Sequence, residues 1–381
     1  MAPCESLPIL YIKASNNFDV GLAIGSCFKA WIQEYVNGSN QVKAVKDFYA
    51  VSKGKDIVSQ YMRTSEEYFP DIVEEIRGIA TGCCLEFIDI FLLQLMSEIE
   101  FCHTIQLENE KLKSSGKGCT GILLNTQQCR IIAHNDDWHP DVVDKVAIVH
   151  VTIDGPEAIK EQFVSYVYPG FLPGFGFQMN KHLAITLNSL NPAVANTSGV
   201  PLVILLRSLL RCKTIDECTT VLDFKPVGCS YGMTINIAEI SSNRMSSVEI
   251  YTTENKSTLS VHWIEFTTEN FEASFYHHEN HYRECGDPAI ACLWEGSIER
   301  GQRLAEKIVQ FTPKNSEDAL QILGDTEGVV GSLYQIAKGR HVADDIQTNA
   351  TALFDFHRKL LLVYRGNPRP PAEPLLSLAF I

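Results

Sequence analysis

A cysteine at the start of an apolar run, well inside the chain, most constrains what this sequence can fold into. Cys119 follows Gly118 and opens the run Gly121 to Leu124, which predicts a buried strand. Residues 109–118, just before it, form a linker-like stretch, and no upstream segment has the pattern of a partner strand. We therefore expect a hairpin with the next apolar run, 130–134.

The position of Cys119 allows two chemical interpretations. If the chain is cut before it, the residue carries both a thiol and a free α-amine, and an amine with a reference pKa of about 8 suits the role of base. The uncut cysteine can attack the carbonyl of Gly118 to form a thioester that water opens, and a glycine tolerates the backbone strain of that attack. The alternative is a small buried hydrophobic residue, the commonest role of a free cysteine.

Several short segments, spread along the chain, resemble motifs of one enzyme family. They are Glu74 to Ala80, Gly118 to Thr120, Asn135 to Asp137, Tyr168 to Phe175, and Asn280-His281. In this order they resemble the acyl-coenzyme A:6-aminopenicillanic acid acyltransferase family of N-terminal-nucleophile hydrolases. Within that family, the sequence is most similar to enzymes that hydrolyse N-β-alanyl amines such as β-alanyl-dopamine and β-alanyl-histamine.

The resemblance implies a role for each matching position. Cys119 is the expected nucleophile, and cleavage is expected between Gly118 and Cys119. Asn280 is expected to donate its side-chain NH2 to the oxyanion. Asp137, 18 residues after the cysteine, is expected to contact the new α-amine or the leaving amine. Without the resemblance, Asn280 is more typical of a turn, and Asp137 of a loop or a helix N-cap.

Two departures from the penicillin enzyme bear on the substrate. Residues 332–335 stand where that enzyme has a Ser-x-x-Arg segment, and Gln335 offers no positive charge to an anionic acceptor. Asp136 stands where the penicillin type has an aromatic residue, and two adjacent carboxylates near Cys119 suit an ammonium group such as that of β-alanine. Asp136, Gln335 and Thr120 are therefore the expected substrate-binding residues.

These residues predict a self-processing cysteine amidohydrolase that cleaves N-β-alanyl or similar aminoacyl biogenic amines through a Cys119 thioester, without a cofactor. One alternative is an acyltransferase in which an amine, rather than water, takes the acyl group. A second is an unprocessed homologue with a binding role. No sequence feature separates hydrolysis from transfer.

No metal site is predicted, although the chain has clustered histidines. His277 and His281 would lie one helical turn apart with His278 between them, but no second cluster with ligand spacing accompanies them. His134 and His139 are expected to be surface or hydrogen-bonded histidines rather than bases.

The composition is that of an intracellular enzyme. The formal charge of −14 and the lack of Lys and Arg clusters argue against nucleic acid as a partner. The first 13 residues lack a basic start and apolar run, and the longest apolar patch, 87–96, is too short to span a membrane. The chain end, Leu378 to Ile381, is not a peroxisomal signal. A cytoplasmic protein with reduced cysteines and a small-molecule amide substrate is expected.

The predicted secondary structure changes character at Cys119. Residues 1–118 are mostly helical and are expected to become a small subunit, which stays associated with the large subunit, 119–381. Strands are expected at 146–153, 163–168, 183–187, 233–238, 248–252, 261–266, 352–356 and 359–364, and helices at 19–36, 85–101, 200–212, 214–224, 288–311 and 316–323. This order favours an α+β fold with antiparallel sheets covered by helices. The resemblance implies a four-layer αββα sandwich, the N-terminal-nucleophile hydrolase fold.

Overall fold

The computed structural model describes residues 7–99, 118–155, 160–267, 269–285, 295–328, 332–337 and 346–381. Most of the expected processing loop, residues 109–117, lies outside these residues. So does the start of the helix predicted at 288–311, of which α11 (Glu295–Gln310) is described.

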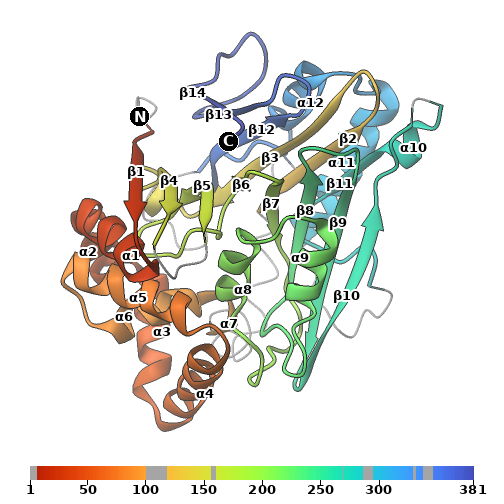
Figure 1. Ribbon diagram of the computed structural model, residues 1–381. Coiled ribbons are helices and arrows are strands. Elements are labelled where there is room, and N and C mark those ends of the chain that lie inside the picture. Colours follow the sequence, from red (N-terminus) through yellow and green to blue (C-terminus); the bar gives the residue numbers. More distant parts are fainter. Residues whose placement is uncertain are drawn as a thin grey trace.

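Two sheets form the centre of the molecule (Figure 1). The larger has eight strands in the order β1-β4-β5-β6-β7-β8-β9-β10, and the smaller has six in the order β11-β2-β3-β12-β13-β14. Their bounds are β1 Ile9–Ala14, β2 Thr120–Asn125, β3 Arg130–Trp138, β4 Ala147–Ile153, β5 Glu161–Val167, β6 Gln178–Asn180, β7 Leu183–Ser189, β8 Met233–Glu239, β9 Met245–Thr253, β10 Lys256–Trp263, β11 Phe275–His278, β12 Gln347–Asp355, β13 Leu360–Tyr364 and β14 Leu376–Ala379.

Helices cover the outer faces of both sheets. They are α1 Asn17–Cys27, α2 Lys29–Gly38, α3 Asn40–Ala50, α4 Ser52–Tyr68, α5 Pro70–Cys83, α6 Phe87–Gln94, α7 Met96–Ile99, α8 Leu202–Leu209, α9 Ile215–Leu222, α10 Phe271–Ser274, α11 and α12 Ser316–Leu323. In Figure 1 the N-terminal helices gather beside β1, β4 and β5, and α8 and α9 lie over the eight-stranded sheet. α11 and α12 cover the six-stranded sheet. The predicted αββα arrangement is confirmed.

The pleat of the β2–β3 hairpin divides its side chains between two cores. Leu123 and Ile132 pack in the large core that reaches the eight-stranded sheet. Ile122 and Ile131 pack in a second core with α11 and α12. Both faces of the hairpin are therefore buried, which explains why its sequence is a continuous apolar run rather than an alternating one.

The N-terminal segment differs from its mostly helical prediction. β1 was not expected, and it pairs in parallel with β4 at the edge of the large sheet. The helix predicted over 19–36 is two helices, α1 and α2, separated at Phe28. Gly82 is the second-last residue of α5, which ends at Cys83. A Cβ at that position would lie 2.5 Å from the Leu22 carbonyl oxygen, so the glycine permits close packing of α5 on α1.

Elements after Cys119 follow the prediction more closely, with exceptions among the shortest strands and at the sheet edges. α12 has the predicted bounds, and the expected β2–β3 hairpin is present. β6, β11 and β14 were missed, and β10 begins five residues earlier than expected. Short or partly exposed strands lack the apolar pattern that identifies a buried strand.

A buried ion-pair network joins the N-terminal helices to the rest of the molecule. Arg207 on α8 is fully buried, with Nη2 2.9 Å from Glu75 Oε2 on α5 and Nη1 2.8 Å from Glu161 Oε2 on β5. Removing one member of such a network would leave a buried charge without compensation. Residues before and after Cys119 therefore belong to one folded unit.

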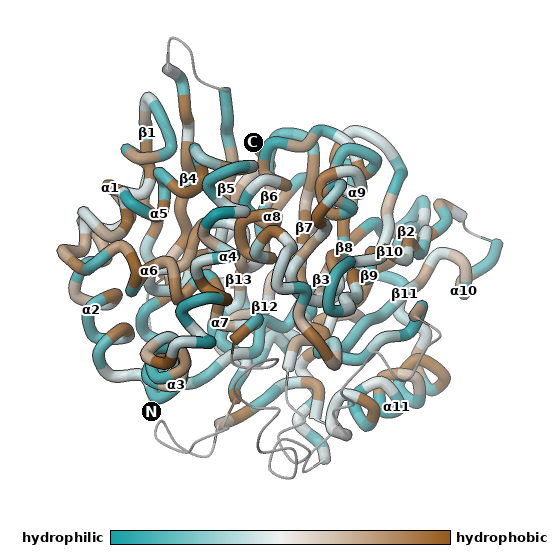
Figure 2. The backbone as a smooth tube through the Cα atoms, turned by 90° about the horizontal axis from the view of Figure 1, so that it is seen from below, coloured by the Kyte–Doolittle hydropathy of each residue, from teal (hydrophilic) through white to brown (hydrophobic). Residues whose placement is uncertain are grey.

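The hydropathy pattern follows the layers. Figure 2 shows brown apolar segments along the strands and the inward sides of the helices, and teal segments mainly in outer turns. None of the described helices has the length and apolar character that crossing a membrane requires.

Candidate active site

The β2–β3 hairpin brings the expected nucleophile close to the Asn135 to Asp137 motif. Cys119 immediately precedes β2, and its Sγ lies 3.8 Å from the carbonyl oxygen of Asp137 near the end of β3. The thiol is buried, with the residue 8% exposed. The hairpin prediction correctly placed the two carboxylates of this motif near the cysteine.

The pleat sends those two carboxylates to opposite faces of the sheet. Asp136 and His134 share with Cys119 the inner face, which is the face that packs toward the eight-stranded sheet. A carboxylate oxygen of Asp136, a ring nitrogen of His134 and the Cys119 sulfur all lie within 4.8 Å of one another. Asp137 shares the outer face with Asn135, whose Nδ2 donates to the carbonyl oxygen of Leu323, at the end of α12, at 3.0 Å and to that of Leu333 at 2.9 Å. Only Asp136 can therefore face a group bound at the thiol side.

The Asp136 carboxylate is buried beside aromatic side chains. Its Oδ2 accepts a hydrogen bond from the Tyr168 hydroxyl. The Tyr168 ring lies 5.9 Å from the Trp138 ring and 6.2 Å from the Phe175 ring, centroid to centroid. Burial raises the pKa of Asp136 to about 7, although the Tyr168 hydrogen bond lowers it in part. The loop from Tyr168 to Phe175, noted in the sequence, thus forms one wall of this pocket.

His134 does not fit its sequence prediction. It is not at the surface: the residue is buried, and one of its two ring nitrogens, Nδ1, has no hydrogen-bond partner among the described residues. Burial lowers the pKa of His134 to about 3, so the imidazole is neutral. A single histidine in an apolar strand gave no signal of this environment.

Asn280 lies directly against Gly118. A Cβ built on Gly118 would be 2.4 Å from Asn280 Oδ1, so only glycine leaves room for this side chain. Arg300 Nη2 donates to Asn280 Oδ1 at 2.6 Å, and Asn280 Nδ2 donates to the Ser189 carbonyl oxygen at 2.9 Å. Because a guanidinium only donates, this contact fixes the orientation of the amide and leaves a second Nδ2 proton for another acceptor.

Arg300 is a candidate site residue that sequence reasoning missed. It is fully buried on α11 and interacts electrostatically with Asp137, Glu279 and Cys119. Burial raises the pKa of the Cys119 thiol well above its usual value, and the charges of Asp136 and Asp137 raise it further. Arg300 opposes this rise. The available sequence signal was an arginine one helical turn before the buried Leu304.

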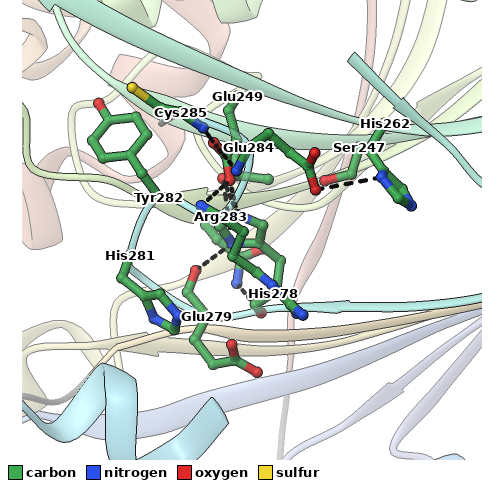
Figure 3. Close-up of polar contacts among 12 residues, drawn as sticks. Ser247, Glu249, His262, His278, Glu279, His281, Tyr282, Arg283, Glu284 and Cys285 are labelled. Carbon is green, nitrogen blue, oxygen red and sulfur yellow. Dashed lines mark hydrogen bonds and ion pairs between the residues drawn. The ribbon is translucent and has the colours of Figure 1, made fainter. Parts of the chain in front are cut away.

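A second charged network anchors the loop that carries Asn280 (Figure 3). Glu249 on β9 accepts hydrogen bonds from three successive backbone N–H groups, those of residues 283–285, at 2.8 to 3.2 Å. Its Oε1 also lies 2.7 Å from His278 Nε2, at the end of β11. Burial alone would raise the pKa of Glu279, but the charges of His277, His278 and Arg283 lower it to about 2. The loop is thus held by two carboxylates, Glu249 through the loop's backbone N–H groups and Glu279 through its contact with His277.

The three clustered histidines are on a strand and its following loop, not on a helix. His278 contacts Glu249, and His281 Nδ1 lies 2.9 Å from Ser297 Oγ. His277 Nδ1 lies 2.8 Å from Glu279 Oε1. They do not gather as metal ligands in the described part of the chain.

Thr120 and Gln335 lie away from the Cys119 face. Thr120 pairs with Asn135 across the hairpin, and its buried hydroxyl has no partner among the described residues. Gln335 Nε2 donates to the Ser332 carbonyl oxygen, and its backbone N donates to Thr348 Oγ1 at 2.9 Å. Thr348 pairs with Asp137, so Gln335 lies on the Asp137 side of the site. Their substrate-binding roles stay predictions.

The raised pKa of Asp136 gives a stability prediction. In an unfolded chain the pKa is about 3.9, so the folded protein holds this proton more tightly. The resulting stabilisation is fully present below about pH 4 and is lost as the pH rises through about 7. Asp136→Asn removes this dependence and keeps an oxygen for Tyr168 to donate to. We expect the variant to melt a few degrees above wild type at about pH 8, and near the wild-type temperature at about pH 4, by circular dichroism. A variant melting below wild type at about pH 8 would contradict this account.

Comparisons with known proteins place the chain among related enzymes. The acyl-coenzyme A:6-aminopenicillanic acid acyl-transferase family profile matches residues 124–370. A beta-alanyl-dopamine/carcinine hydrolase from Drosophila melanogaster is 25% identical over 378 residues, covering 96% of this chain and 94% of that protein. A solved N-acylethanolamine-hydrolyzing acid amidase ortholog from Caenorhabditis elegans is 11% identical with a TM-score of 0.40, covering 67% of this chain and 95% of that chain.

The family profile spans more than half of the sequence, including β3, the aromatic loop, Asn280 and Arg300. The predicted relationship is confirmed, and with it the expectation of an enzyme that acts on amides. The chain belongs to the acyl-coenzyme A:6-aminopenicillanic acid acyl-transferase family.

Proposed function

We propose that this protein is a self-processing cysteine amidohydrolase that releases β-alanine, or a similar amino acid, from amides of biogenic amines. The observation that carries the proposal is the position of Asp136, on the same face as Cys119, with a carboxylate oxygen within 4.8 Å of Sγ. A buried carboxylate next to a nucleophile favours a substrate with a positive charge close to its scissile carbonyl.

The dimensions of a β-alanyl group fit this spacing. Its ammonium is separated from the carbonyl carbon by two methylenes, and at attack the carbonyl carbon lies about 3 to 3.5 Å from sulfur. The ammonium can then reach Asp136, while the neutral His134 offers a second acceptor. The faces of Tyr168 and Trp138 add cation–π attraction to an ammonium in this pocket.

The catalytic steps use the residues around Cys119. In the processed chain, its α-amine takes the thiol proton and the thiolate attacks the amide carbonyl. Asn280 Nδ2 donates to the oxyanion, with its orientation fixed by Arg300. The leaving amine takes a proton from the α-ammonium. Water then hydrolyses the thioester and releases the amino acid, so no cofactor is needed.

The positive charge of Arg300 has a second effect. It opposes the rise that Asp136 and Asp137 cause in the thiol pKa. Asp137 interacts electrostatically with Arg300, and in this proposal it balances that charge and orients the free α-amine of Cys119. Asp136 can then serve substrate binding rather than proton transfer.

The same geometry supports cleavage of the chain before Cys119. Asn280 contacts Gly118, whose carbonyl carbon is the atom that Cys119 would attack, so one donor serves both processing and catalysis. The Arg207 network and the β1–β4 pairing would keep the fragments 1–118 and 119–381 together. The Drosophila relative, named for hydrolysis of β-alanyl-dopamine and carcinine, supports the same substrate class.

Processing has a direct test. We expect purified wild-type protein to give two masses, for residues 1–118 and 119–381, because Cys119 supplies the only nucleophile required. Cys119→Ala should remain a single chain by intact-mass measurement. Fragments of the same masses from the alanine variant would mean that another protein makes the cut.

Acyl transfer is the second candidate function, favoured by the transferase description of the family. A buried thiol can shield a thioester from water until an amine arrives. Analysis of the products formed with a competing amine or a coenzyme A thioester separates transfer from hydrolysis. A chain that stays uncut and inactive would instead support the non-catalytic binding protein.

The substrate proposal is tested by removing either the negative charge of Asp136 or the positive charge of the substrate ammonium. Butanoyl-dopamine replaces the ammonium of β-alanyl-dopamine with a methyl group of similar size. We expect Asp136→Asn to lower kcat/KM for the β-alanyl amide by about a hundredfold, which is about 2.7 kcal/mol, because a buried charge pair is lost. Its kcat/KM for the butanoyl amide should change little.

Asp154→Asn, at an exposed carboxylate just after β4, is the matched control and should affect neither substrate. Equal losses of Asp136→Asn on both amides would show that Asp136 supports the pocket without recognising an ammonium.

A further inference from the structure

The inner face of the β2–β3 hairpin gathers three side chains that are all good ligands for a thiophilic metal ion. Cys119, His134 and Asp136 each offer one ligand atom, and these atoms lie within 4.8 Å of one another. All three residues are buried. Thiolate, imidazole and carboxylate are the side chains that bind Zn²⁺ in proteins.

A second observation concerns the ring of His134. Its Nδ1 is buried without a hydrogen-bond partner among the residues described. Leaving a polar nitrogen dry and unpaired is costly, and most proteins avoid it. A neutral imidazole nitrogen is also the form that coordinates metals.

The distances allow tetrahedral coordination after small rotations. With Zn–S near 2.3 Å and Zn–N or Zn–O near 2.0 Å, ligand atoms in a tetrahedral site lie about 3.3 to 3.7 Å apart. The present spacing of up to 4.8 Å requires an approach of about 1 Å, which rotation about the side-chain bonds supplies.

Cleavage before Cys119 would complete the ligand set. The freed α-amine and the thiolate of one cysteine form a five-membered chelate ring with a bound metal. Sulfur, this amine, His134 and Asp136 then give four ligands, and this fourth ligand rests on the processing proposed above. The intact chain offers three.

We propose that this pocket is an inhibitory site for a thiophilic divalent cation of the Zn²⁺ type. Binding replaces the thiol proton, which leaves to solvent, with a sulfur–metal bond. The bound ion then blocks three groups that the reaction needs: the Cys119 sulfur, the α-amine that acts as its base, and the Asp136 carboxylate that binds the substrate ammonium. Inhibition is therefore reversible by a chelator and competitive with the amide. Mg²⁺ and Ca²⁺ are excluded, because they require several oxygen ligands and the set provides one carboxylate.

The test measures metal binding separately from catalysis. Purified protein is titrated with Co²⁺, which gives a thiolate-to-metal charge-transfer band, and Zn²⁺ is then added as a competitor. We expect the band in wild type, its loss with Zn²⁺ and its absence in Cys119→Ser. His134→Gln should weaken Co²⁺ binding about tenfold or more. His262→Gln, on the exposed part of β10, should bind as wild type.

X-ray absorption of the wild-type Zn²⁺ complex provides a measurement that needs no variant. One sulfur and three nitrogen or oxygen ligands are expected, and more than one sulfur would place the ion at other cysteines. Absence of the Cys119-dependent band, or wild-type affinity in His134→Gln, overturns the proposal. Protein that hydrolyses the amide without binding Co²⁺ refutes only the metal site, whereas protein that binds Co²⁺ without hydrolysing the amide refutes only the proposed function.

Discussion

The two-residue period of the β2–β3 hairpin is the constraint on which the arrangement of this site depends. It places Cys119, His134 and Asp136 on the inner face and Asn135 and Asp137 on the outer face. A register shift of one residue would exchange these faces and move Asp136 away from the thiol. Packing of both faces, against the second sheet and against α11 and α12, fixes the register.

Around this hairpin, most buried charged side chains interact with a group of opposite charge or with hydrogen-bond partners. Arg300 interacts electrostatically with Asp137, Glu279 and Cys119 and donates a hydrogen bond to Asn280. Glu249 accepts hydrogen bonds from backbone N–H groups of the loop that carries Asn280 (Figure 3). Compensation is weaker at Asp136 on the inner face: burial raises its pKa to about 7, although the Tyr168 hydrogen bond and the charge of Arg365 oppose the rise. A buried carboxylate with a raised pKa fits the class of cationic substrate proposed above.

Sequence reasoning succeeded where structure is determined locally. The β2–β3 hairpin and α12 follow from apolar runs, turns and helix boundaries that lie within a few residues of each other. β1 was missed because its partner, β4, lies more than a hundred residues away and the pairing is parallel. The close contact that Gly82 allows between α5 and α1 likewise depends on packing and not on the local sequence.

The candidate site was predictable only in part, for the same reason. Cys119, Asn280 and the Asn135 to Asp137 motif could be found by resemblance, whereas the environment of His134 and the position of Arg300 depend on the folded packing. The split of Asp136 from Asp137 follows from strand periodicity once the strand is known to continue to Trp138. The predicted strand ended at residue 134, so this inference was not reached. The roles of the site residues stay predictions until chemistry tests them.

The central claim is that one residue, Cys119, is both a chain terminus and the carrier of the acyl group. Its most direct test is peptide mapping of enzyme quenched with acid during turnover of β-alanyl-dopamine. We expect a peptide that begins at Cys119 and carries one β-alanyl group as a thioester. An acyl group on any other residue, or an active chain that remains joined between Gly118 and Cys119, would contradict the account.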